Sequence, residues 1–415
     1  MLSMPIRPRT ILTLGLAACG LFGATACKSS WHASNGAQTS QTTTTTSKRK
    51  AEPRAEQKTV AALDARYIVG PTPSRELGMR ISWQQDIPLD GTSGIKSLWM
   101  AGSDVLSVDG RNRLTLLRAS DGNQIWHAVP LPPREAVLGV DRLTMPRGQD
   151  HIFLTTDTDM FEIDANTGHL ISRQNMRRIP DTGVSQFGPN LIFGCSDGRI
   201  IWHNVTVGHE LQANKLDSGI AATPQLVGTD VVVVSEKGEV MMIDAITAKR
   251  IWRRDLPAGI SAKPAASELG VFVAGLGQSL WSLNERDGSV NWKYFTESPL
   301  ATGPTLLGDR VFQFVPTEGL ICFDAVSAGT PNGTVLWRAN GLSGEIITAI
   351  GNDLVLWDSN ARMLRLVEAT RGGIRAEVHL PQAASVQAFR PDGRNLVLLT
   401  WSDDGRIERL VPNNI

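Results

Sequence analysis

The feature that most constrains this fold is an eleven-residue pattern that recurs at a nearly fixed interval along the chain. The two clearest copies are Met242-Ile-Asp-Ala-Ile-Thr-Ala-Lys-Arg-Ile-Trp252 and Ser282-Leu-Asn-Glu-Arg-Asp-Gly-Ser-Val-Asn-Trp292. Each copy is typical of the end of one strand, a tight turn and a new strand that closes on tryptophan. A period of about 40 residues that contains several short strands predicts the blade of a β-propeller.

Aligned on its closing position, the pattern recurs along most of the chain. Serine replaces tryptophan at position 172, and the copies that end at positions 211 and 376 are degenerate. In chain order, the seven units close at Trp126, Ser172, Leu211, Trp252, Trp292, Trp337 and Ala376.

Two fragments remain outside these units, one at each end of the array. Residues 79–88 read as a closing strand without strands before it, and residues 384–411 read as three strands without a closing strand. Pairing the first strand with the last three makes one more blade and removes two open sheet edges. The sequence therefore predicts an all-β, eight-bladed β-propeller of four-stranded antiparallel blades, closed by both ends of the chain.

Within a unit, strands and turns alternate clearly. The run Val231-Val-Val-Val-Ser235 is typical of a strand buried on both faces, and Glu236-Lys-Gly238 after it is a turn signal. Glycine at the end of such a turn can adopt the positive φ that a hairpin needs. The same explanation covers the Thr-Gly and Asp-Gly pairs in the turn before the closing strand.

Composition sets broad limits on partners. Acidic and basic residues are equal in number, 41 of each among 415 residues. This balance gives no bulk attraction to nucleic acid or to anionic lipid. The array is long enough to form one large domain, which we place at residues 79–415.

The first 27 residues resemble an export signal. Arg7 and Arg9 precede an apolar run, residues 11–26, that is short for a membrane span. A cysteine at the end of such a run resembles the lipobox of bacterial lipoproteins, in which the thiol is acylated. We favour Cys27, which follows a full-length apolar core, over Cys19, and a simple cleaved signal without lipid stays open.

Residues 28–78 are rich in Ser, Thr, Gln, Lys and Ala. Such a composition buries too little apolar surface to order itself. The sequence therefore predicts a disordered tether between the signal and the propeller.

No catalytic, cofactor or metal site is predicted. The seven histidines have no metal-ligand spacing, and Asp157 and Asp159 lack the continuation of a calcium loop. Cys195 and Cys322 lie in different units and are interpreted as buried, unpaired thiols.

The tryptophans separate into two groups. One group shares the closing position, for which we predict packing between neighbouring blades, and consists of Trp83, Trp126, Trp252, Trp292 and Trp337. A stacking platform for a ligand would need a tryptophan that breaks this pattern. The candidates, interpreted as core residues, are Trp99, Trp202, Trp281, Trp357 and Trp401.

The eleven-residue pattern resembles the repeat of the pyrroloquinoline-quinone (PQQ)-like propellers, over most of the chain. The matching positions include Asp164, Ala165, Thr167, Gly168, Asp244, Ala245, Thr247, Trp252, Asp287, Gly288 and Trp292. In one branch of that family, the quinoprotein dehydrogenases, adjacent cysteines cover the quinone and carboxylates bind calcium. Neither pattern occurs in this sequence. The signal, the cysteine, the tether and the number of blades resemble the other branch, the BamB-like lipoproteins.

The resemblance implies a non-catalytic scaffold lipoprotein of the cell envelope that needs no cofactor. Its implied partners are envelope proteins, among them a barrel-inserting outer-membrane protein. Nucleic acid is not an implied partner. Its implied location is the periplasmic face of the outer membrane, through the N-terminal lipid anchor. Two alternatives stay open, a PQQ-dependent oxidoreductase and an envelope propeller that binds a sugar or peptide ligand.

Overall fold

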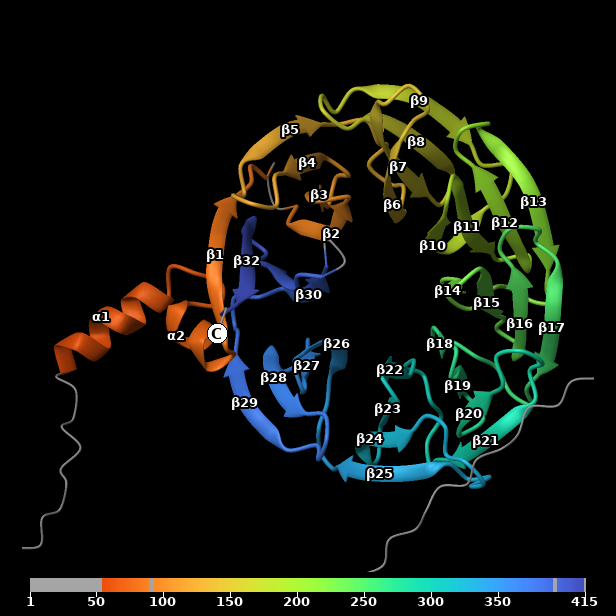
Figure 1. Cartoon of the computed structure of the whole chain (residues 1–415). Helices are drawn as coiled ribbons and strands as arrows, with labels where there is room; N and C mark the ends of the chain where they lie inside the picture. Colours follow the sequence, from red (N-terminus) through yellow and green to blue (C-terminus); the bar gives the residue numbers. More distant parts are fainter. Residues whose placement is uncertain (1–53, 90–92, 391–393, 414–415) are drawn as a thin grey trace, which may run out of the picture. The chain divides into compact units, whose positions relative to one another are not determined.

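A computed structural model describes residues 54–89, 93–390 and 394–413. Its strands form eight four-stranded antiparallel sheets, which follow one another around a ring (Figure 1). This arrangement confirms the predicted eight-bladed propeller. The described part of the chain also contains two helices, and neither is long and apolar enough to cross a membrane.

The first four blades follow the chain in order. Blade one consists of β2 (Ile95–Ala101), β3 (Asp104–Asp109), β4 (Leu114–Leu117) and β5 (Gln124–Ala128). Blade two consists of β6 (Val137–Thr144), β7 (Asp150–Thr156), β8 (Asp159–Asp164) and β9 (Leu170–Asn175). Blade three consists of β10 (Pro180–Phe187), β11 (Asn190–Cys195), β12 (Arg199–Asn204) and β13 (His209–Lys215). Blade four consists of β14 (Gln225–Val227), β15 (Asp230–Val234), β16 (Glu239–Asp244) and β17 (Arg250–Asp255).

The remaining blades complete the ring. Blade five consists of β18 (Ala265–Ser267), β19 (Gly270–Gly275), β20 (Ser279–Leu283) and β21 (Val290–Phe295). Blade six consists of β22 (Thr305–Leu307), β23 (Arg310–Val315), β24 (Gly319–Asp324) and β25 (Thr334–Ala339). Blade seven consists of β26 (Glu345–Ile350), β27 (Asp353–Asp358), β28 (Met363–Glu368) and β29 (Ile374–His379). Blade eight consists of β30 (Ser385–Phe389), β31 (Val397–Trp401), β32 (Arg406–Pro412) and β1 (Met79–Asp86).

Blade eight closes the ring as the sequence predicts. β1 pairs antiparallel with β32, from Met79 opposite Pro412 to Asp86 opposite Arg406, and the register shifts once, beside Ser82. Figure 1 shows the two strands side by side although they lie at opposite ends of the chain. The pairing leaves β1 as the outermost strand of its blade.

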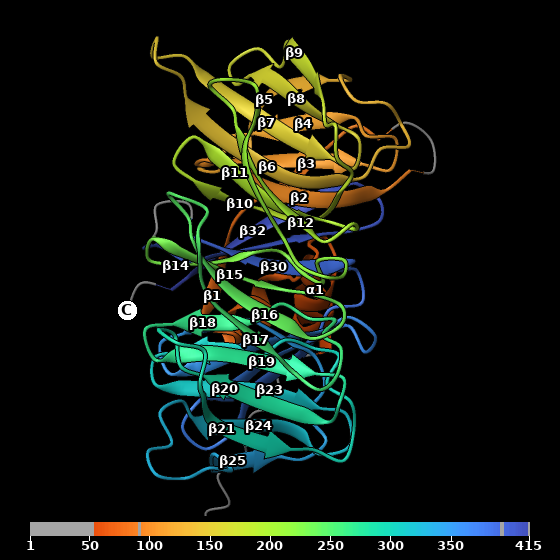
Figure 2. The ribbon, with the colours of Figure 1, turned by 90° about the vertical axis from the view of Figure 1, so that its right-hand side faces the viewer.

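The core lies between blades and inside them. The second and third strands are buried on both faces, as in β15 and β16, whereas the fourth strands β9 and β13 alternate between exposed and half-buried side chains. In Figure 2 two of these outermost strands, β17 and β21, lie on the outside of the ring. The alternation follows from the position of the fourth strand, which has the ring on one face and solvent on the other.

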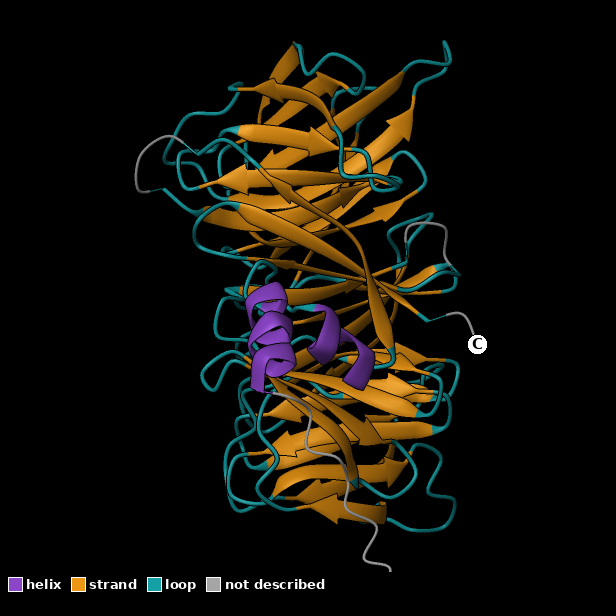
Figure 3. Ribbon diagram, turned by 90° about the vertical axis from the view of Figure 1, so that its left-hand side faces the viewer, coloured by secondary structure: helices purple, strands orange, loops and turns teal. Residues whose placement is uncertain are grey.

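The structure contradicts the last part of the predicted tether. Residues 54–78 contain α1 (Arg54–Asp64) and α2 (Pro71–Glu76), which lie on the outside of the ring (Figure 3). Ile68 and Val69 are 3% and 4% exposed and join a core cluster with blades seven and eight. The backbone N–H groups of both residues donate to the Glu408 carboxylate, at 2.9 Å and 3.5 Å. The segment is ordered because a few of its apolar residues pack against blades seven and eight. The average composition of residues 28–78 does not reveal these few residues.

This docked segment explains why the seventh unit has no closing tryptophan. In the five blades that have a closing tryptophan, this residue covers the turn between the third and fourth strands of the next blade. Blade eight has no such turn, because its third strand, β32, and its fourth strand, β1, are the last and the first strands of the described residues and are not consecutive. Ile68 and Leu77 pack there instead, beside Ala376.

Glu408 should make stability fall as the pH rises. The residue is 0% exposed, and burial raises the pKa of its carboxyl from 4.5 to about 7. Because the folded pKa is the higher one, the stabilisation is complete below about pH 4.5 and is lost as the pH rises through about 7. In Glu408→Gln the amide oxygen can still accept the N–H bonds but cannot ionise. We expect this variant to remove roughly 3 kcal/mol of the decrease in unfolding free energy between pH 5 and 8.

Urea titrations at several pH values measure this effect. Asp141 provides a comparison, because its Oδ2 atom is buried without a partner and burial raises its pKa to about 7 as well. Asp141→Asn should remove a separate contribution of the same sign, in blade two. A Glu408→Gln variant with the pH dependence of the natural protein would contradict the assignment.

Candidate functional site

A large cavity among the described residues lies in the channel of the propeller. Its volume is ≈ 1420 Å³. The innermost strands β14, β18, β22, β26 and β30 contribute to its wall, together with the loops that connect successive blades. The first strand of each blade faces the axis of a propeller, so the wall combines side chains from five consecutive blades.

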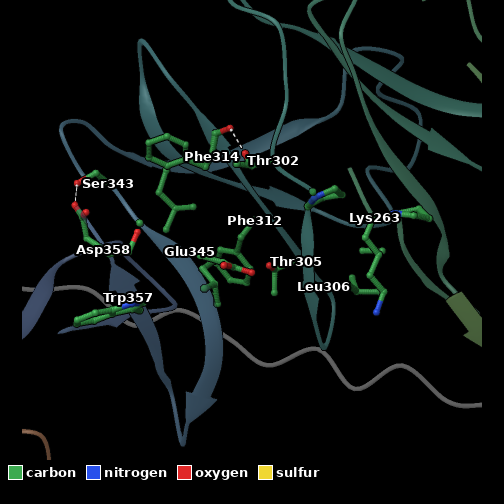
Figure 4. A pocket seen from close by; sticks show the side chains of 18 of the residues that line it. Lys263, Thr302, Thr305, Leu306, Phe312, Phe314, Ser343, Glu345, Trp357 and Asp358 are labelled. Atoms are coloured by element: carbon green, nitrogen blue, oxygen red, sulfur yellow. Dashed lines mark hydrogen bonds between the residues drawn. The ribbon is translucent and has the colours of Figure 1, made fainter. Parts of the chain in front are cut away.

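One side of this cavity is aromatic and the other side carries a cation. Figure 4 shows Phe312, Phe314 and Trp357 around one side and Lys263 on the other. Lys263 lies in the loop between β17 and β18, and Glu345 is the first residue of β26. The cavity therefore offers apolar surface with a few polar groups, which is typical of a binding pocket.

Lys263 is the cation of the cavity wall. Burial lowers the pKa of its ammonium group, although much of the side chain remains solvent-exposed. Neither Lys263 nor Glu345 forms an ion pair with any residue that the structure describes. Both charges are therefore available to a bound molecule.

Asp358 borders the same cavity but is already engaged. Its carboxylate accepts hydrogen bonds from the Ser343 hydroxyl and from the backbone N–H groups of Asn360 and Ala361, and lies 3.6 Å from Arg365. The Ser343 hydrogen bond is the largest of the effects that lower the pKa of Asp358. The residue thus fixes the loops at the cavity wall.

Trp357 breaks the repeat pattern and also lines this cavity. It is 5% exposed, which agrees with its interpretation as a core residue. Its buried Nε1–H finds no acceptor among the described residues. The structure thus places it both in the core and at the cavity wall.

The cavity does not fit PQQ as the quinoprotein branch would hold it. Cys195 and Cys322 are buried free thiols in blades three and six, and burial raises the pKa of each to about 12. Neither lines the cavity, and they do not form an adjacent pair. Across the described ranges, no group of three or more His, Cys, Asp or Glu side chains could hold a metal ion.

The tryptophans at the repeat position lie between blades and away from the central cavity. Each indole N–H donates to a backbone carbonyl in the next blade, at 2.8–3.0 Å. In order, Trp83, Trp126, Trp252, Trp292 and Trp337 donate to Ala119, Ala165, Glu285, Ala325 and Ala369. The geometry gives all five one structural role.

Trp202 has the same role from a different strand. It lies on β12 rather than on the closing strand, is 1% exposed and donates its Nε1–H to the Ala245 carbonyl at 3.0 Å. The closing residue of that blade, Leu211, is 50% exposed. The sequence contains the signal, a tryptophan nine positions before a degenerate closing residue, but alignment on the closing strand alone does not reveal it.

The predicted lipidation sites, Cys27 and Cys19, lie outside the described residues. The same holds for the predicted signal, residues 1–27, and for the tether up to residue 53. These assignments stay predictions.

Comparison with known proteins confirms the resemblance that the repeats predict. Residues 180–313 match the family described as outer membrane protein assembly factor BamB. The BamB of Bordetella pertussis (strain Tohama I) is 23% identical over 201 residues, which are 44% of this chain and 52% of the relative. The match therefore spans about half the length of that relative.

Solved structures share the fold. BamB from Moraxella catarrhalis superposes with a TM-score of 0.60 at 15% identity, covering 80% of this chain and 97% of that one. The computationally designed Ika8 protein gives 0.60 at 14% identity, covering 79% and 100%. Saccharomyces cerevisiae Sqt1 gives 0.61 at 11% identity, covering 80% and 98%. At these identities the likeness concerns the fold alone.

Proposed function

We propose that this chain, a PQQ-like propeller of the BamB type, is a non-catalytic scaffold lipoprotein of the cell envelope. In this proposal it binds other proteins during outer-membrane β-barrel assembly, and a lipid at Cys27 anchors it to the periplasmic face of the outer membrane. The observation that carries the proposal is the match of residues 180–313 to the BamB family.

The positions of the perturbed ionisable groups support a scaffold. Burial raises the pKa values of Asp141, Glu408, Cys195 and Cys322 strongly, and none of the four lines the central cavity. Of the groups that line the cavity, burial lowers the pKa of Lys263 and the Ser343 hydrogen bond lowers that of Asp358. Catalytic sites usually gather such groups in one cleft. Here the four groups with raised pKa values are distributed over blades two, eight, three and six, inside the packing of each blade.

The face that we assign to partner binding is the end of blade five that carries Lys263. The loop between β17 and β18 reaches the turn after β19, where the Leu276 N–H donates to the Gly259 carbonyl at 2.8 Å. Two large apolar side chains are exposed at this end, Leu276 at 40% and Phe295 at 66%. Exposed apolar groups at the same end of a blade as a cation without an ion pair suit a protein interface.

Affinity purification from detergent-solubilised native membranes tests the function. We expect the full chain to recover a large β-barrel protein of the outer membrane. Lys263→Glu should reduce that recovery severalfold, because it reverses a charge at the proposed interface.

Lys249→Glu is the matched control. Lys249 is exposed in the turn before β17, and Lys263 lies in the loop after β17. The two lysines therefore lie at opposite ends of this strand. Absence of any barrel protein from the purified material would overturn the scaffold proposal. Equal losses in the two variants would overturn only the assignment of the binding face.

A further inference from the structure

A second cavity, between blades seven and eight, gathers positive charge. Its volume is ≈ 600 Å³, and its wall contains Arg80, Arg390, Arg394 and Arg409, which we call the arginine pocket. Its described lining residues include no aspartate or glutamate. It lies where β1 begins and β32 ends, at the hairpin ends of β26 and β30. The neutral net charge of the chain thus conceals a local cationic cluster.

Arg409 forms the centre of the pocket. It lies on β32, its Nη1 donates to the Ser82 hydroxyl at 2.9 Å, and its buried Nε–H finds no acceptor among the described residues. Burial is the larger cause that lowers the pKa of Arg409, and the charge of Arg80 is the second cause. The guanidinium group is therefore held in place by one neutral hydroxyl while a like charge lies close by.

Arg80, on β1, and Arg390, directly after β30, also line the pocket. Arg80 is exposed on β1 and forms no ion pair with any described residue. Arg390 follows β30, and its Nη1 donates to the Arg394 carbonyl at 3.0 Å. Because residues 391–393 lie outside the described part, the inference rests on Arg80, Arg390 and Arg409.

Comparable arginines elsewhere in the ring have acidic partners. Arg365 lies 2.6 Å from Glu377, and Arg142 lies 2.9 Å from Asp104 and 3.0 Å from Asp150. Arg409 is a partly buried cation without an acidic partner among the described residues, which is costly, and the exposed Arg80 and Arg390 that line the same cavity add like charge. An anion with several oxygen atoms would satisfy them together, and the planar fork of arginine matches phosphate oxygens.

We propose that the arginine pocket binds a phosphate group, held between Arg80, Arg390 and Arg409. Arg80 lies on β1, which directly follows α2 in the chain. The chain before α2 leads back to the proposed lipid anchor at Cys27. A lipid headgroup at the membrane surface and free phosphate are the two sources of this ligand chemistry. The site is independent of the partner-binding face on blade five.

Isothermal titration calorimetry of the full chain in neutral detergent tests the pocket. The probes are inorganic phosphate, dihexanoyl phosphatidylglycerol and dihexanoyl phosphatidylcholine. We expect saturable binding of the first two, weakened about tenfold or more by Arg80→Ala and by Arg390→Ala, each of which removes charged hydrogen bonds. Tighter binding of phosphatidylglycerol than of phosphate identifies a lipid headgroup, and the reverse order identifies free phosphate.

Arg147→Ala is the control for net charge. Arg147 is exposed in the hairpin between β6 and β7, which corresponds to the hairpin between β30 and β31. Because Arg80, Arg390 and Arg147 are all exposed, the variants should keep the thermal midpoint of the natural protein. Absence of saturable binding of both phosphate and phosphatidylglycerol, or an equal loss in Arg147→Ala, would overturn the proposal.

Discussion

Replacing Trp292 with alanine should lower the free energy of unfolding by about 3–5 kcal/mol. The residue is 1% exposed and packs between blades five and six. Its ring stacks on Phe323 with centroids 5.6 Å apart and lies 5.9 Å from Phe272, and its indole N–H donates to the Ala325 carbonyl at 3.0 Å. Alanine leaves a cavity at this interface and an unpaired carbonyl in the neighbouring turn.

Urea unfolding followed by far-ultraviolet circular dichroism measures this loss. Phe295→Ala is the control on the same strand, because Phe295 is 66% exposed and the Lys293 ammonium lies 3.8 Å from its ring centroid. We expect that change to cost less than about 1 kcal/mol. If the two variants lost the same stability, burial between blades would not be the role of the closing tryptophan.

Replacing Gly288 with alanine should also destabilise the protein, for two separable reasons. Gly288 has a φ of 69°, and a Cβ atom there would lie 2.6 Å from Cε3 of Trp252. Gly308→Ala isolates the backbone cost, because Gly308 has a φ of 58° and no atom would lie within 4 Å of the added carbon. We expect about 1–2 kcal/mol for Gly308→Ala and a further ~1–3 kcal/mol of overpacking for Gly288→Ala.

A double-mutant cycle measures the overpacking directly. In a Trp252→Leu background, the cost of Gly288→Ala should approach that of Gly308→Ala, since the indole ring is gone. The chain contains a natural precedent in Ala248, which has a φ of 51° in the equivalent turn of blade four. The preceding blade closes with Leu211, and the tryptophan that reaches this turn, Trp202, comes from the third strand instead of the closing strand. An unchanged cost of Gly288→Ala in the Trp252→Leu background would contradict this explanation.

The Trp–Gly contact shows how far a sequence pattern can be interpreted. The sequence places glycine in the turn and tryptophan at the closing position, and backbone conformation accounts for the glycine. The structure adds that the glycine of one blade lies under the tryptophan of the preceding blade, as in Gly168 under Trp126 and Gly372 under Trp337. These pairs are far apart in sequence, so no pattern within one repeat reveals them.

The candidate sites were less accessible from the sequence than the fold. Glu345 and Trp357 are cross-strand partners in blade seven, whereas Lys263 lies in the loop that leads into blade five. Lys263 lines the same cavity as the other two only because the inner strands share one channel. Arg80 and Arg409 likewise meet only because the first strand of the propeller pairs with the last. The composition indicates no attraction for anions, because it averages the charge over the whole chain. The arginine pocket forms only when the ring closes.

The sequence by itself determined the blade, the number of blades and the way the ring closes. Each blade is a local strand–turn–strand unit, so its hydrophobic pattern and turn residues lie within one short stretch of chain and can be interpreted there. Only the tertiary structure decided that residues 54–78 dock on blade eight, that Trp202 substitutes for a missing closing tryptophan, and that arginines gather between blades seven and eight. The physical reason is distance along the chain, because Ile68 and Glu408 are 340 positions apart and their hydrogen bond leaves no local signal.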